Sequence, residues 1–205
     1  MKKNLAQVTT LLFLAASVWG QEAAASKGIE QYEAHDYAEA EKSLRAAMEA
    51  EPEDWRAPYY LGLTLVKLQR PAEALRAFDL ATEKPDANLA DIKLGQAQAL
   101  IAQKEFAPAE RQIQEAARIN SEHKDLAYTR GLLFLARRDF SNAARQFEAT
   151  LARDPRNAYA HYYAGMAYNG LKRPDRMVAH FDTFLKLAPT APEAAKVQSV
   201  LRSVR

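Results

Sequence analysis

Apolar and polar residues follow one another along this chain with the spacing of amphipathic helices. From residue 21 onward, apolar positions recur three and four residues apart, and stretches that alternate every second residue are almost absent. The first spacing places apolar side chains on one face of an α-helix, whereas a half-buried strand needs the second. The pattern therefore predicts an all-α protein.

The helical pattern repeats with a period of about 34 residues. A small residue returns at intervals of 34 or 35 positions, at Gly28, Gly62, Ala97, Gly131 and Gly165. Sixteen positions after each of these stands a large apolar residue: Leu44, Phe78, Ile113, Phe147 and Phe181. Between them lie the polar pairs His35-Asp36, Gln69-Arg70, Lys104-Glu105, Arg138-Asp139 and Lys172-Arg173. Each unit thus predicts two helices that are joined by a short turn and approach closely at the small residue.

Local signals predict where several of these helices begin. Asp36 followed by Glu39 is typical of a helix N-cap with an acidic third residue. Pro71 and Pro174 follow predicted turns, and proline suits a first helical turn because its missing N–H needs no partner there. Residues 190–193, Thr-Ala-Pro-Glu, have the pattern of a capping box that opens a final helix.

The period, the pairing of small and large residues, and the closing prolines resemble the tetratricopeptide repeat. The resemblance divides residues 21–205 into the repeats 21–54, 55–89, 90–123, 124–157 and 158–191, followed by a capping helix over 192–205. The fourth repeat matches best; the second closes early at Pro85, and the third has Ser121 where proline is usual. The resemblance implies eleven helices in a right-handed superhelical solenoid with a concave groove.

The resemblance also implies which residues face that groove, because the first helix of each repeat lines it in this family. These residues are Tyr32, Tyr59, Leu63, Val66, Leu94, Gln98, Tyr128, Leu132, Leu135, Tyr159, Tyr162, Met166 and Asn169. Eight of the nine tyrosines fall in predicted first helices. Tyrosine suits a surface that is apolar but hydrated, so we expect the stripe to bind a partner. Packing between repeats is the alternative role for single tyrosines.

No part of the sequence has the spacing of a catalytic, cofactor or metal site. The chain has no cysteine, and its histidines (His35, His123, His161 and His180) form no metal-binding motif. There is no nucleophile elbow and no glycine-rich phosphate loop. We therefore expect a non-catalytic protein that uses neither cofactor nor metal.

Residues 1–20 have the three parts of a secretory signal peptide. Lys2 and Lys3 precede an apolar stretch of about 15 residues and then small residues, and a membrane-spanning helix needs about 20 apolar residues. This pattern predicts export to the periplasm or secretion, with cleavage after Gly20 or, as second choice, after Ala25. An uncleaved anchor is the alternative; after cleavage we expect no stable membrane insertion.

Charge is spread unevenly over a nearly neutral chain. The net charge of +2 comes from Lys2 and Lys3, and the neutral remainder argues against nucleic-acid binding. Residues 21–54 carry a net charge of −7, whereas residues 124–205 carry +7. This polarity predicts two ends that recognise opposite charges, on two partners or on a second copy in a head-to-tail contact. A solvated surface without a partner is the alternative.

Together these features predict an exported scaffold or adaptor that binds a protein or peptide partner in its groove. Three other functions stay open. The chain could be a structural component of an envelope assembly, a non-catalytic binder of cell-wall glycan, or an accessory domain of an enzyme.

Overall fold

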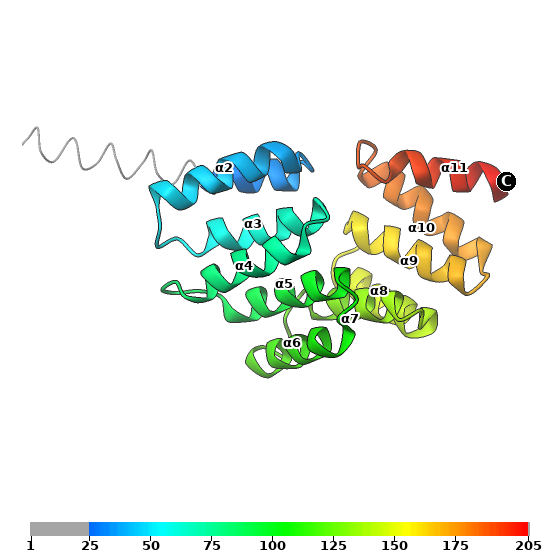
Figure 1. Cartoon of the computed structure of the whole chain (residues 1–205). Helices are drawn as coiled ribbons and strands as arrows, with labels where there is room; N and C mark the ends of the chain where they lie inside the picture. Colours follow the sequence, from blue (N-terminus) through cyan, green and yellow to red (C-terminus); the bar gives the residue numbers. More distant parts are fainter. Residues whose placement is uncertain (1–24, 205) are drawn as a thin grey trace, which may run out of the picture. The chain divides into compact units, whose positions relative to one another are not determined.

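The computed structural model describes residues 25–204, which form helices joined by short turns (Figure 1). A helix over residues 25–33 is followed by α2 (Tyr37–Ala50), α3 (Arg56–Lys67), α4 (Pro71–Thr82), α5 (Leu89–Ala102), α6 (Phe106–Ile119), α7 (Leu126–Ala136), α8 (Phe140–Arg153), α9 (Ala158–Gly170), α10 (Pro174–Leu187) and α11 (Ala194–Val204). The described part of the chain contains no strand. The all-α prediction and the eleven helices are confirmed.

These helices form two compact units that divide between Asn88 and Leu89. The first unit holds the helix over residues 25–33 together with α2, α3 and α4, and the second holds α5 to α11. The division falls at the irregular junction that the sequence shows after Pro85. There Asp86 has a left-handed backbone, with φ of 56°.

Every turn inside a repeat ends its first helix in the same way. The second residue of the turn has φ between 56° and 65°; these residues are His35, Gln69, Lys104, Arg138 and Lys172. The next N–H then reaches back five residues, as from Asp139 to the carbonyl of Phe134 at 2.9 Å. Glycine usually occupies such left-handed positions because it has no Cβ to clash. Here five residues with side chains adopt this conformation.

The predicted N-terminal signals act as expected on three second helices. The carboxylate of Asp36 accepts a hydrogen bond from the N–H of Glu39 at the start of α2. Pro71 and Pro174 are the first residues of α4 and α10. These caps satisfy or remove N–H groups that have no partner inside the helix.

The last helix begins later than the predicted capping box implies. α11 starts at Ala194 and ends at Val204, and residues 190–193 form the turn before it. The carboxylate of Glu193 accepts a hydrogen bond from the hydroxyl of Tyr159, at 3.0 Å. A tertiary contact to α9 thus uses the group that the capping box would have turned back onto its own helix.

The small and large residues of each repeat meet in the core. A Cβ built on the glycine would lie 2.5–2.7 Å from the large side chain in four pairs: Gly28 with Leu44, Gly62 with Phe78, Gly131 with Phe147 and Gly165 with Phe181. In the third repeat the corresponding residues are Ala97 and Ile113, which are also buried. The predicted close approach of the two helices is confirmed, because no side chain larger than hydrogen fits at these glycines without displacement.

The signal peptide predicted for residues 1–20 lies outside the described residues. Ala25 opens the first described helix and is buried with Ala47 and Ala57. Between residues 25 and 204, no helix combines the length and the apolar character that crossing a membrane requires.

Candidate functional site

The tyrosines lie on the first helices of the repeats, as the sequence predicts. They belong to the helix over residues 25–33, α3, α7 and α9, and Tyr37, at the start of α2, is the exception. Four tyrosines of the predicted groove are half-buried: Tyr32, Tyr59, Tyr128 and Tyr159. Each of these rings packs on one side and keeps part of its surface exposed, which is what an aromatic binding surface requires.

In the first unit, five aromatic side chains form a continuous row. Neighbouring ring centroids are 5.2–5.8 Å apart along the order Tyr37, Tyr32, Tyr60, Tyr59 and Trp55. Such tilted and edge-to-face contacts add about 0.5–1.5 kcal/mol beyond area burial. The sequence pointed to Tyr32 and Tyr59, but it missed the neighbours that complete the row.

In the second unit, the tyrosines of α7 and α9 gather around Tyr163. Its ring centroid is 5.0 Å from that of Tyr162, 6.0 Å from that of Tyr128 and 6.3 Å from that of Tyr159. Tyr163 also stacks on the buried ring of Phe147, with 5.7 Å between centroids. The predicted groove positions omitted Tyr163, although it links the other three tyrosines to the core.

The remaining predicted groove residues differ in how much they expose. Leu63, Leu94 and Tyr162 are buried, with exposed fractions of 9%, 2% and 8%. Half-buried are Val66, Gln98, Leu132, Leu135 and Met166, and Asn169 is exposed. Leu132 and Leu135 pack against the core between α8 and α9. These three buried residues contribute to the packing of the helices more than they offer surface to a partner.

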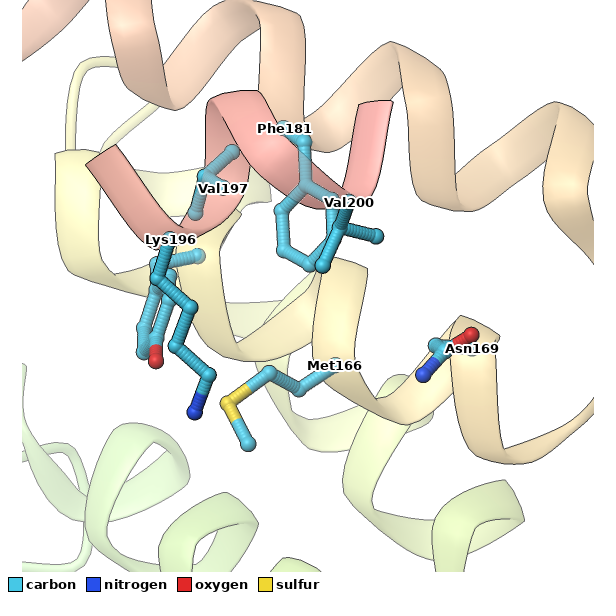
Figure 2. A pocket seen from close by; sticks show the side chains of 7 residues that line it. Met166, Asn169, Phe181, Lys196, Val197 and Val200 are labelled. Atoms are coloured by element: carbon cyan, nitrogen blue, oxygen red, sulfur yellow. The ribbon is translucent and has the colours of Figure 1, made fainter. Parts of the chain in front are cut away.

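Three predicted residues of α9 meet in one pocket with α10 and α11 (Figure 2). The pocket has a volume of about 160 Å³ and is lined by Tyr162, Met166, Asn169, Phe181, Lys196, Val197 and Val200. Apolar side chains form its walls, and Lys196 and Asn169 add an amine and an amide. The pocket is concave, mostly apolar and equipped with few polar groups, as binding sites usually are.

The hydroxyl of Tyr162 keeps its proton at this pocket. Burial raises the pKa of Tyr162, and the nearby carboxylate of Glu193 raises it further. A protonated hydroxyl offers a hydrogen-bond donor and adds no charge to the apolar wall.

A second pocket of about 230 Å³ lies between α6 and α7. Its lining residues are Glu110, Ile113, Gln114, Arg130, Leu133 and Phe134. None of them belongs to the predicted groove, and the pair of charged residues makes this pocket more polar than the one beside α11.

The repeat pattern is matched by a known family. The sequence profile of the tetratricopeptide repeat matches residues 26–88 and 128–192, which together are more than half of the chain. This chain belongs to the tetratricopeptide-repeat family. Domains of this family are typically scaffolds for protein–protein interaction and are generally non-catalytic. No curated protein matches the sequence.

Solved tetratricopeptide-repeat structures share the fold at low sequence identity. TTC0263 of Thermus thermophilus has a TM-score of 0.73 and 20% identity, over 88% of this chain and 98% of that protein. The pilF protein of Pseudomonas aeruginosa has a TM-score of 0.58 and 16% identity, over 91% and 86% of the two chains. A repeat protein of Parabacteroides merdae has a TM-score of 0.58 and 14% identity, over 81% and 64%. These likenesses establish the fold alone.

One group of side chains in this tetratricopeptide-repeat domain has the composition of a metal site. Oxygen or nitrogen atoms of Asp91, His123 and Asp125 lie within 4.8 Å of one another. However, the backbone N–H of Asp125 donates to Nδ1 of His123 at 3.2 Å, so Nε2 carries the ring proton and donates to Asp91 at 2.8 Å. A metal bound to Nε2 would need that proton on Nδ1, facing the backbone N–H. The group fits a hydrogen-bonded link between α5 and the start of α7.

Two other histidines link α8, α9 and α10. The Nδ1 atoms of His161 and His180 lie 3.0 Å apart, and Nε2 of His180 is 3.2 Å from Oε1 of Glu148. Tyr168 donates its hydroxyl to the same carboxylate at 2.9 Å and stacks on the ring of His180. Burial lowers the pKa of His180, although Glu148 opposes that shift. These contacts hold helices together.

Proposed function

We propose that this tetratricopeptide-repeat domain is a non-catalytic scaffold that binds a segment of a partner protein along α7 and α9, the tyrosine-bearing first helices of its second unit. One observation carries the proposal: the predicted groove residues of α9 line a pocket that adjoins the tyrosine cluster of the second unit. Tyr162 belongs to both features, since it lines the pocket and contacts Tyr163. A partner segment on α7 and α9 would therefore meet aromatic surface and an apolar pocket together.

The half-buried tyrosines supply the surface on which such a segment would rest. Tyr128 contacts the ring of Phe147, and Tyr159 contacts that of Phe184 and donates to Glu193. These contacts fix the rings before a partner arrives, so little side-chain entropy is lost on binding. Rigid aromatic side chains of this kind are frequent among the residues that dominate binding energy.

Peptide selection followed by affinity measurement tests this proposal. Peptides selected from a phage library on the wild-type protein should bind Tyr128→Ala and Tyr159→Ala at least fivefold more weakly, the equivalent of about 1 kcal/mol. The control is Ile119→Ala, which removes an exposed apolar side chain from a second helix. Urea unfolding of each variant separates lost binding from lost stability. Equal affinity for all three variants would refute the proposal.

We also propose that the protein is exported and acts in the periplasm or after secretion. The basic start, the short apolar stretch and the small residues of positions 1–20 support this proposal. The packing of Ala25 on Ala47 and Ala57 favours cleavage after Gly20, because a cut after Ala25 would remove a buried residue of the first helix. N-terminal sequencing of material from the cell envelope should begin at Gln21. Cytosolic protein that retains Met1 would contradict export.

Head-to-tail self-association is a second candidate, and the uneven charge supports it. Residues 21–54 carry −7 and residues 124–205 carry +7, so the acidic segment of one copy would attract the basic segment of another. Such attraction acts over about 10 Å at 0.1 M salt and is lost at high salt. Sedimentation velocity should then show larger species at low salt only. A monomer at every salt and protein concentration would rule the contact out.

The remaining candidate functions are separated by simple binding assays. A binder of cell-wall glycan should sediment with insoluble glycan, and the tyrosine substitutions should release it. A structural component of an envelope assembly should co-purify with the same proteins when the tyrosines are replaced.

A further inference from the structure

The pocket beside α11 has the size and lining of a site for one apolar side chain. Its volume of about 160 Å³ is close to that of engineered apolar cavities of about 150 Å³ that bind benzene. Val197, Val200 and Phe181 form apolar walls. Met166 lies at the same pocket (Figure 2), and its flexible thioether adapts to side chains of different shape. A leucine, methionine or phenylalanine side chain fits this description.

Among the described residues that line this pocket, Lys196 alone carries a charge. Lys196 contributes to the pocket and is exposed, and no carboxylate among the described residues pairs with its amine. α11 itself contains Lys196 and Arg202 but no acidic residue. Residues 158–205 include seven basic and three acidic residues, a net charge of +4. An acidic group beside the bound apolar side chain would complement this charge.

Asn169 adds a neutral hydrogen-bonding group to the same pocket. It is exposed near the end of α9, and its amide contributes both a donor and an acceptor. The pocket therefore offers a bound segment an apolar wall, one cation and one amide. A basic segment would meet Lys196 as a like charge, so the pocket disfavours it.

We propose that this pocket binds an acidic segment of a partner protein, inserting one apolar side chain between α9 and α11 and pairing an Asp or Glu side chain with Lys196. This assignment rests on the proposed scaffold function and names the chemistry of the partner segment. The apolar residue and the acid should lie within about one helical turn of each other in sequence, because Lys196 lines the same pocket as its neighbour Val197.

A random peptide library displayed on phage, with the peptide C-termini fused to the coat protein, tests this proposal. Peptides selected on the full-length protein should carry a large apolar residue with Asp or Glu within four positions. As synthetic fluorescent peptides, they should bind Lys196→Glu and Asn169→Asp at least tenfold more weakly, since both changes add negative charge to the pocket. Lys186→Glu, an equal charge reversal on α10 at a residue outside the pocket, should change affinity less than twofold.

The outcomes separate this pocket from the general scaffold function. Peptides that lose affinity for Tyr128→Ala but bind Lys196→Glu normally would overturn the pocket and leave the scaffold function standing. A library that yields no binder to the wild-type protein would overturn both. Replacing the Asp or Glu of a selected peptide with Asn or Gln should weaken binding at least tenfold, and unchanged affinity would overturn the side-chain pairing with Lys196. All three charge variants alter exposed residues, so the fold is kept.

Discussion

Replacing Gly131 with alanine tests whether the pairing of small and large residues sets the distance between the two helices of a repeat. A Cβ built on Gly131 lies 2.7 Å from Cε1 and 2.8 Å from Cζ of Phe147. Carbon atoms in favourable contact are about 3.5–4.0 Å apart. The ring of Phe147 would have to withdraw by about 0.8 Å to reach that range.

Phe147 has little room for this movement. Its side chain is fully buried, it stacks on Tyr163, and its centroid lies 6.0 Å from that of Tyr128. Overpacking of a core usually costs about 1–3 kcal/mol, and three ring atoms lie within 3.0 Å of the new methyl group. Alanine regains about 1 kcal/mol over glycine in a helix. We therefore expect Gly131→Ala to lower the free energy of unfolding by about 0–2 kcal/mol.

The matched control restores the pair that the third repeat already uses. Combining Gly131→Ala with Phe147→Ile recreates the residues found at Ala97 and Ile113. Phe147→Ile alone leaves unfilled space, and the methyl group that the double variant adds at position 131 occupies part of it. The cost of the double variant should therefore be smaller than the sum of the two single costs, by about 1 kcal/mol.

Urea unfolding followed by far-ultraviolet circular dichroism gives the free energy of unfolding of the wild type, the two single variants and the double variant. The slope of the free energy of unfolding against urea concentration should be the same for all variants, so that the midpoints of unfolding can be compared directly. Two results would refute the reasoning: costs that add without coupling, or a Gly131→Ala variant that is more stable than the wild type. Either would mean that the helices separate freely at this contact.

Three further predictions concern other contacts of the fold. Lys104→Gly should raise the free energy of unfolding by about 0.5–1 kcal/mol, because φ at this residue is 64° and glycine adopts this left-handed conformation without strain. Lys104→Ala keeps a Cβ and should give no such gain in the same urea assay. Asp139→Ala should lower the free energy of unfolding by about 1 kcal/mol in thermal or urea unfolding. The carboxylate of Asp139 accepts a hydrogen bond from the N–H of Asn142 at 3.2 Å and thereby caps α8. Asp139→Asn keeps an acceptor at this position and should retain most of the stability. Burial lowers the pKa of His180 in the folded protein, so the unfolded chain binds the proton more readily, and stability should fall as the pH drops below about 6.5. Unfolding at several pH values should show a smaller fall in His180→Gln, and an identical pH profile in that variant would contradict the role of His180.

Local signals in the sequence were sufficient to place most helices. The N-cap at Asp36 and the first-turn prolines at Pro71 and Pro174 act through residues only a few positions away, so they work in the same way in any tertiary context. The pairing of Gly131 with Phe147 also followed from the sequence, because a fixed period brings the same two positions together in each repeat. The same regularity located the tyrosines on the first helices.

Only part of the candidate site could be predicted from the sequence. Tyr162, Met166 and Asn169 were predicted from their register positions. Lys196, Val197 and Val200 were not, because the resemblance predicts α11 only as a capping helix and assigns it no groove position. The sequence pattern also missed Trp55 and Tyr60, which complete the aromatic row of the first unit, and the central place of Tyr163 in the second. The reason is related. The exposed side of each ring depends on the neighbouring helix, and the periodicity of one helix does not contain that information.

What the sequence determined by itself is the period, the helices and the turns, since these depend on backbone preferences and on residues close in the chain. Only the tertiary structure decided which of the regularly spaced side chains remain exposed and can contact a partner. Leu94 and Tyr162 share a register position with Tyr128, yet the first two are buried and Tyr128 is half-buried. Likewise, α11 starts at Ala194 after a turn in which Glu193 accepts a hydrogen bond from Tyr159 of α9, a contact that the local pattern does not contain. Burial and hydrogen bonding between helices depend on packing partners that are distant in the chain, and the local pattern does not specify them.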